Sequence, residues 1–211
     1  MSHYNKQYFD WQKNIGQIGG YLNMFKFEKY INSNDKLLDF GCGGGYLLKN
    51  FNVKEKFGFE INVATHQQCK EFNINVTDKW DDLQDNYFDT IISNHAMEHV
   101  HEPLNILKNL YKKLKPNGKL VIVIPCEQPS GTGFHYKEND INQHLYTWCP
   151  MTFGNLAKLA GFNIITCNTI QHQWCPDYQT TWGKTDFYER CVQHAKKNGN
   201  YQVRLIATKL N

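Results

Sequence analysis

The sequence lacks a long apolar run. Its longest, residues 120–125, is far shorter than the roughly 18 residues that cross a bilayer, so we expect neither a transmembrane segment nor a membrane partner. The first residues are polar and aromatic and lack the apolar stretch of a secretory signal, so we expect a cytoplasmic location. Repeats and low-complexity linkers are also missing, and the 211 residues predict a single globular domain with a sizeable core.

Paired cysteine motifs and an excess of one charge are absent as well. The seven cysteines contain no Cys-x-x-Cys pair, which excludes a locally built zinc ribbon or thioredoxin-type motif and favours reduced thiols in a cytosolic protein. The 23 Lys and Arg against 20 Asp and Glu give a net charge of only +3, and the lysines alternate with acids. We therefore expect no nucleic-acid partner.

Short apolar segments alternate with helical patterns along the chain. Residues 119–125 form the continuous apolar run that is typical of a central strand buried on both faces. Residues 103–114 carry leucines at helical spacing, with a proline in the first turn. Further strands are expected at residues 36–40, 57–60, 74–77, 88–93, 162–170 and 201–208, and further helices at 46–51, 62–71, 151–160 and 187–197. This order predicts an α/β domain with a mainly parallel sheet.

Three segments lack this alternation. Residues 1–31 are too aromatic for a free tail, and we expect them to form a helical lid over the open end of the sheet. Residues 126–150 are rich in Gly, His and aromatic side chains without periodicity. We expect this segment, together with residues 171–198, to form insertions on the substrate side of the single domain.

A glycine-rich loop follows the first predicted strand. Glycines at this place let the backbone turn tightly and present its N–H groups to a ligand at the carboxyl edge of a parallel sheet. Glu60 ends the next strand, where its carboxylate can accept hydrogen bonds from ribose hydroxyls. A dinucleotide fingerprint would need its third glycine where Tyr46 stands, which disfavours an NAD-dependent oxidoreductase.

The spacing Asp39-x-Gly41-x-Gly43-x-Gly45 resembles motif I of the class I S-adenosylmethionine-dependent methyltransferases. Residues 86–100 and 114–123 resemble the fourth strand and fifth strand of that family. The resemblance implies a Rossmann-like, doubly wound sheet of seven strands with helices on both faces and an antiparallel last strand. It also implies S-adenosylmethionine as the cofactor, bound by Asp39, Gly41, Gly43, Gly45, Glu60, Asn62, Asp78 and Asn94.

The resemblance also implies an acid after the third strand that binds the adenine amino group. Asp78, Asp81 and Asp82 all follow the third strand, and we select Asp78, with Trp80 as a neighbour of the adenine ring. The alternative interpretation is that these are surface turn residues.

The turn after the fourth predicted strand narrows the class of acceptor. Ser93-Asn94-His95-Ala96 replaces the Asn/Asp-Pro-Pro-Tyr motif of enzymes that methylate amino groups of nucleic acids. A hydroxyl acceptor needs a base, and imidazole titrates near neutral pH. We predict His144 as this base, with His95 as the second choice; structural or exposed rings are the alternative.

The predicted activity is O-methylation of a small molecule or a glycan intermediate. Residues 97–100 resemble a stretch of the ubiquinone-biosynthesis O-methyltransferases, some of which use a divalent metal there. A Glu-His pair alone is insufficient for a metal site, so we predict none. The alternatives are the NAD-dependent oxidoreductase and a non-catalytic partner subunit that binds S-adenosylmethionine.

Overall fold

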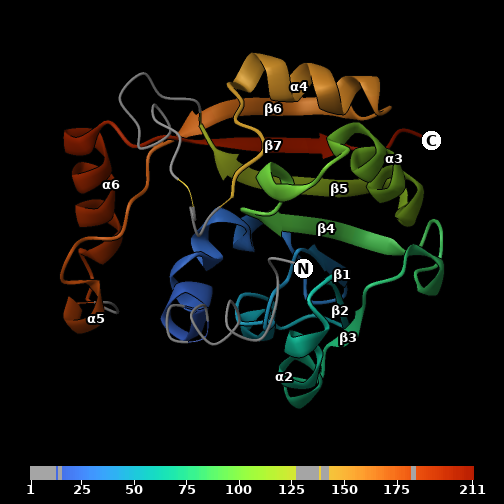
Figure 1. Ribbon diagram of the computed structural model, residues 1–211, viewed down its shortest axis with the longest axis horizontal. Helices are drawn as coiled ribbons and strands as arrows, with labels where there is room; N and C mark the ends of the chain where they lie inside the picture. The colour runs from blue at the N-terminus through green and yellow to red at the C-terminus, as the bar shows by residue number, and fades with distance from the viewer. Residues whose placement is uncertain (1–12, 14–15, 127–137, 139–142, 182–183) are drawn as a thin grey trace.

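The computed structural model describes residues 13, 16–126, 138, 143–181 and 184–211. Its centre is a seven-stranded sheet with the order β3-β2-β1-β4-β5-β7-β6 (Figure 1). The strands are β1 Lys36–Phe40, β2 Glu55–Phe59, β3 Asn75–Thr77, β4 Phe88–Asn94, β5 Leu114–Pro125, β6 Asn163–Ile170 and β7 Gln202–Thr208. The first five strands pair in parallel, and β7 is antiparallel to both β5 and β6. The predicted mainly parallel sheet with an antiparallel last strand is confirmed.

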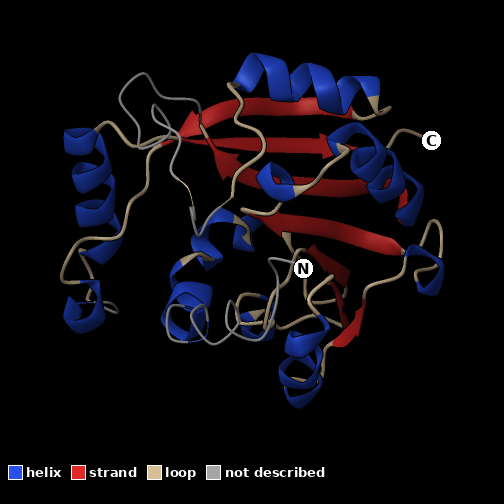
Figure 2. Cartoon of the chain, in the orientation of Figure 1, coloured by secondary structure: helices blue, strands red, loops and turns tan. Residues whose placement is uncertain are grey.

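The helices lie on both faces and beyond one edge of the sheet (Figure 2). They are α2 His66–Glu71, α3 Pro103–Lys113, α4 Pro150–Leu159, α5 Tyr178–Thr181 and α6 Phe187–Asn198. Single 3-10 turns are η1 Met24–Lys26, η2 Glu28–Tyr30, η3 Leu48–Asn50, η4 Val63–Thr65, η5 Trp80–Asp82 and η6 Met97–His99. In Figure 1 the strand β4 points its carboxyl end toward the part of the N-terminal segment that is drawn in blue. No helix of the described residues has the length and apolar character needed to cross a membrane.

Two apolar layers cover the sheet, because side chains alternate between its faces. Leu38 belongs to a core cluster that includes Leu107 of α3 and Phe153 of α4. Its neighbour Leu37 belongs to a second cluster, which includes Phe27 of the N-terminal segment and Cys69 of α2. The N-terminal segment therefore forms part of one of the two layers that bury the central strands.

The N-terminal segment also packs beside the glycine loop. Residues 16–22 are helical. A Cβ atom on Gly20 would collide with the backbone of Tyr46, so only glycine allows this close approach. The predicted helix at residues 46–51 is wrong: the chain makes only the turn η3, and Phe51 is already extended. Tyr46 and Leu47 are buried under the N-terminal helix, which constrains their backbone more strongly than local helix propensity does.

Candidate functional site

The glycine loop joins β1 to η3 at the carboxyl edge of the sheet. Gly41, Gly43 and Gly45 all have positive φ values, of 74°, 52° and 75°, which other residues adopt only with strain. The Gly41 N–H donates to the Phe59 carbonyl oxygen at 2.8 Å, so β2 holds the start of the loop. Three alternating glycines are therefore required by the backbone itself.

Glu60 fastens the same loop to the end of β2. Its Oε2 accepts a hydrogen bond from the Gly43 N–H at 2.8 Å, and its Oε1 accepts one from the Asn62 N–H at 2.8 Å. Burial raises the pKa of Glu60, and these two backbone donors oppose the rise. Burial also raises the pKa of Asp39, and the negative charge of Glu60 adds to that effect. Two acids thus lie buried beside the loop, where donors of a polar ligand can pair with them.

A cavity of about 1060 Å³ opens beside the loop and Glu60. Of the predicted cofactor residues it is lined by Gly41, Gly43, Glu60, Asn62 and Asp78. Trp80 also lines the cavity and stacks on Phe59 with ring centroids 4.2 Å apart. Asp39, Gly45 and Asn94 do not contribute to the lining. The structure therefore brings most of the predicted set together around one space with a polar rim and an aromatic wall, as ligand sites have.

The turn after β4 forms another part of the cavity wall, beside the glycine loop. His95 and Ala96 line it, and a Cβ atom on Gly41 would collide with the Ala96 side chain. His95 itself has a positive φ of 54°, a strained conformation for a residue with a side chain. Its N–H is held by the Val123 carbonyl oxygen of β5 at 2.8 Å. This turn thus adjoins both the glycine loop and the centre of the sheet.

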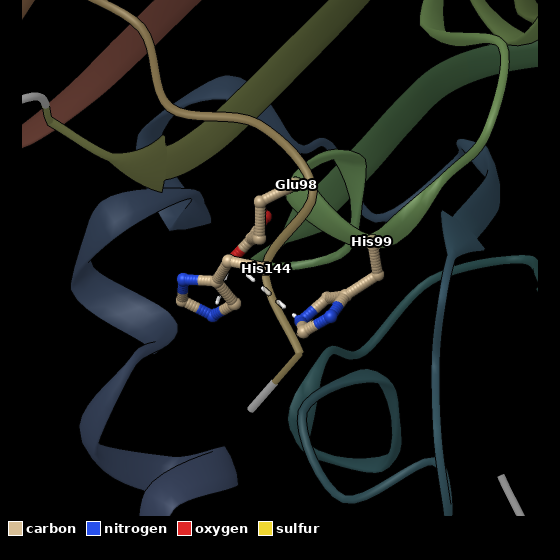
Figure 3. A group of neighbouring side chains, drawn as sticks. All are labelled: Glu98, His99 and His144. Atoms are coloured by element: carbon tan, nitrogen blue, oxygen red, sulfur yellow. Dashed lines mark ion pairs between the residues drawn. The ribbon is translucent and has the colours of Figure 1, made fainter. Parts of the chain in front are cut away.

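Both predicted histidines point to one buried carboxylate, Glu98. Its Oε1 lies 3.3 Å from His95 Nδ1 and 3.9 Å from His144 Nε2. His99 Nε2 lies 4.0 Å from the same oxygen. Figure 3 shows the carboxylate between the imidazoles of His99 and His144. The Glu98 side chain is completely buried, and neither carboxylate oxygen has a hydrogen bond of good geometry within the described residues.

The charge of Glu98 is retained in spite of its burial. Burial by itself raises the pKa of this carboxyl, but the facing imidazoles of His95 and His99 outweigh it, so the pKa is lowered. Burial lowers the pKa of His99, although Glu98 opposes this change. The backbone oxygen of Glu98 accepts hydrogen bonds from the N–H groups of Leu145 and Tyr146, at 2.8 and 3.2 Å. These bonds fix the segment that carries His144.

The same three side chains could hold a metal ion. One ligand atom each from Glu98, His99 and His144 lies within 4.8 Å of the others. Imidazole nitrogen and carboxylate oxygen are ligands of zinc and related divalent ions. The prediction of no metal rested on the Glu98-His99 pair alone, and the third ligand, His144, comes from a distant segment.

A family model described as a methyltransferase domain matches residues 12–167, most of the chain. The chain belongs to this family. The class I methyltransferase assignment and S-adenosylmethionine as the cofactor are thereby confirmed, in preference to NAD.

Relatives of this methyltransferase domain act on different acceptors. Over 171 residues it is 27% identical to phosphoethanolamine N-methyltransferase 1 of Triticum aestivum, covering 74% of this chain and 34% of that protein. Over 109 residues it is 31% identical to the ubiquinone biosynthesis O-methyltransferase of Rickettsia conorii, covering 46% and 38%. The chain thus spans about a third of the length of the curated relatives that it matches.

Solved structures show the same fold at low sequence identity. An S-adenosylmethionine-dependent methyltransferase from Archaeoglobus fulgidus superposes with a TM-score of 0.68 at 19% identity, covering 96% of this chain and 99% of that chain. The architecture of the methyltransferase domain is therefore shared over nearly its whole length.

Sequence reasoning missed two residues of the methyltransferase site. His99 was noted only as the neighbour of Glu98, although its ring lies 4.8 Å from that of His144. Lys26 was not singled out at all, yet its Nζ donates to Asn94 Oδ1 at 3.3 Å across 68 residues of sequence. Burial lowers the pKa of Lys26 to about 7, against the attraction of Glu98. A lone lysine in an aromatic segment gives no local signal of such a contact.

Proposed function

We propose that this domain transfers a methyl group from S-adenosylmethionine to a hydroxyl oxygen of a small molecule or a glycan intermediate. The observation that carries the proposal is the position of His95. Its side chain lines the cavity beside the glycine loop, and its Nδ1 faces the buried Glu98 at 3.3 Å. A base that adjoins both the cofactor cavity and a fixed carboxylate is what a hydroxyl acceptor needs.

The residues around the cavity fit the cofactor. We assign Glu60 and Asn62 to the ribose, and Asp78 and Trp80 to adenine, since all four line the cavity. The glycine loop and Asp39 are assigned to the methionine part, with Asp39 acting from behind the lining. When bound, S-adenosylmethionine supplies a methyl group on a sulfonium, an electrophile that reacts by in-line displacement. The protein must therefore align an acceptor with that methyl group and exclude water.

Proton removal from the acceptor is assigned to His95 rather than to His144, the first choice from the sequence, because His95 lines the cavity and His144 does not. If Nδ1 of His95 keeps its proton and donates toward Glu98, Nε2 carries the free electron pair that takes the hydroxyl proton. Glu98 then stabilises the imidazolium that forms, as a buried carboxylate does for an adjacent histidine. His144 Nε2, 3.9 Å from the same carboxylate oxygen, can hold the acceptor or share the proton.

Acceptor recognition is assigned to the segments outside the central fold. Residues 1–31, 126–150 and 171–198 are proposed as a lid and two insertions on the acceptor side. In the described parts of these segments, Leu22 packs with Phe187 and Cys191 of α6. Leu145 reaches the cavity wall beside His95. We place the reaction in the cytoplasm, since all seven cysteines are free thiols.

A methyl-transfer assay with isotope-labelled S-adenosylmethionine tests this proposal. Catechol, a hexose derivative and phosphoethanolamine serve as probes of three acceptor classes, and binding of S-adenosylhomocysteine is measured in parallel by calorimetry. Wild type is compared with the variants His95→Ala and His144→Ala, and with Lys158→Ala as an exposed control on α4, outside the cavity lining. Each assay is repeated after EDTA treatment to show whether a metal at Glu98, His99 and His144 is required.

Label on a hydroxyl probe that is lost with His95→Ala, while affinity for S-adenosylhomocysteine stays, supports the proposal. Label on the amine of phosphoethanolamine alone replaces it with N-methylation, the activity named for the wheat relative. Binding of the cofactor product without transfer to any probe favours a non-catalytic subunit. Full transfer by both histidine variants contradicts the assignment of the base.

A further inference from the structure

Lys26 is a buried cation that the methyltransferase site does not explain by itself. It ends η1, and only 2% of its surface is exposed, whereas Lys29 three residues later is exposed. Lysine is among the residues least often buried, because an unpaired ammonium in the interior is costly. The contacts of Lys26 should therefore explain why a lysine is buried at this position.

The first contact is with the last residue of β4. Lys26 Nζ lies 3.3 Å from Asn94 Oδ1, and an ammonium can only donate. The interaction thus holds the amide oxygen of Asn94 and leaves its NH₂ group to other partners. Asn94 immediately precedes His95, whose backbone has the strained φ of 54°. Such strain persists only where surrounding contacts fix the chain, and Lys26 is one of them.

The second interaction is with the charge of Glu98. Both side chains are fully buried and have opposite charge, and Glu98 is the group that attracts the Lys26 ammonium. His172, the other titratable group that acts with Lys26, is kept neutral: burial and the lysine charge lower its pKa to about 3. The carboxylate that faces the three histidines is therefore the negative charge that favours the protonated form of Lys26.

We propose that Lys26 is a positioning residue for methyl transfer. By binding Asn94 and balancing Glu98, it fixes the turn at residues 94–99 and makes the geometry of His95 depend on the N-terminal segment. The inference rests on the proposed function for its catalytic consequence. Its structural consequence does not rest on that function, because the conformation of residues 94–99 can be measured without catalysis.

Hydrogen exchange tests the structural consequence. Backbone amides are followed by NMR in the presence of S-adenosylhomocysteine, for wild type, Lys26→Met and the control Lys158→Met, which changes an exposed lysine of α4. Lys26→Met removes the charge but keeps a long side chain. We expect exchange at His95, His99 and Leu145 to rise about tenfold in this variant, as local opening becomes easier, with no change at Gly43. Unchanged exchange at residues 94–99 overturns the inference.

Measurement of turnover tests the catalytic consequence. The acceptor is the probe that wild type methylates in the methyl-transfer assay described above. For Lys26→Met we expect kcat to fall about 10- to 100-fold, the usual effect of small misplacement, with the KM for S-adenosylmethionine within about threefold. Lys158→Met should match wild type in both. Wild-type kcat in Lys26→Met overturns the inference while the proposed function stands. If wild type itself transfers no methyl group, the proposed function fails and the exchange result alone decides on Lys26.

Loss of folding in Lys26→Met is separated from loss of positioning by a second variant. Removal of one partner leaves Glu98 as an uncompensated buried charge, whereas Lys26→Met with Glu98→Gln removes both charges. We expect the double variant to melt closer to wild type than Lys26→Met does and still to show fast exchange at His95. Wild-type exchange at His95 in a stably folded double variant contradicts a positioning role.

Discussion

The cofactor half and the acceptor half of this site are built differently. In the cofactor half, defined by residues 39–45 and 60–62, each oxygen of the buried Glu60 carboxylate accepts a hydrogen bond from a backbone N–H. In the proposed acceptor half, defined by residues 94–99, His144 and Lys26, the buried carboxylate of Glu98 faces imidazole rings and has no hydrogen bond of good geometry among the described residues. The first half is organised before a ligand arrives. The second half is held by side-chain charges instead of backbone hydrogen bonds.

This difference matches what the two ligands require. A fixed cofactor can be bound by backbone groups, which do not depend on side-chain identity. An acceptor that differs between relatives must be recognised by side chains, and here they converge from the N-terminal segment, the turn after β4 and the segment before α4. Mutations should therefore be able to change cofactor affinity without changing turnover of the bound cofactor, and the reverse.

The largest separation is expected from His95→Ala. Loss of a general base typically lowers turnover about 10²- to 10⁴-fold, while the glycine loop and Glu60 remain intact. We expect the affinity for S-adenosylhomocysteine to stay within about threefold, by calorimetry. A parallel loss of affinity would show that the halves are one unit.

Gly41→Ala should break both halves together, because Gly41 lies between them. Its positive φ and the collision of a new Cβ with Ala96 should lower the free energy of unfolding by about 2–4 kcal/mol. Gly199→Ala is the matched control, since Gly199 has a φ of 65° but nothing within 4 Å of a new Cβ, and only the strain of about 1–2 kcal/mol applies. Chemical denaturation measures both. Adding Ala96→Gly to Gly41→Ala should restore part of the lost free energy of unfolding. No recovery would mean that the collision with Ala96 does not cause the destabilisation.

Glu60→Ala should damage only the cofactor half. Hydrogen bonds to a buried carboxylate contribute about 1.5–3 kcal/mol, so affinity for S-adenosylhomocysteine should fall roughly 10- to 100-fold in calorimetry. Glu71→Ala, at an exposed end of α2, is the control. Exchange rates at His95 and Leu145 should not change; if they rise, Glu60 also supports the acceptor half.

Per unit of the variable changed, the smallest effect concerns the pH dependence of stability. Folded Lys26 releases its proton above pH 7, whereas the unfolded lysine keeps it to about 10.5, so the unfolded state binds more protons in this range. Wild-type stability should therefore gain roughly 1 kcal/mol per pH unit from pH 7 to 10 relative to Lys26→Met, when denaturation curves are compared. Glu98 and His172 face Lys26 and keep their charge states across this range. Parallel curves for the two proteins would mean that burial does not lower the pKa of Lys26.

The sequence was sufficient for the elements with strong local patterns. The apolar run at residues 119–125 and the leucine spacing at 103–114 predicted β5 and α3 because periodicity reflects burial directly. The glycine spacing predicted the loop because only glycine tolerates those positive φ values. The helix expected at 46–51 failed because Tyr46 and Leu47 pack beneath a helix more than twenty residues earlier, which no local pattern reveals.

What the sequence determined by itself is the α/β order, the glycine loop and the acid after β2, since each depends on neighbouring residues and on backbone geometry. Only the tertiary structure decided that His95, His99 and His144 share one carboxylate and that Lys26 binds Asn94. The physical reason is that buried charges are stable only with partners, and partners are chosen by distance in the fold rather than by distance along the chain.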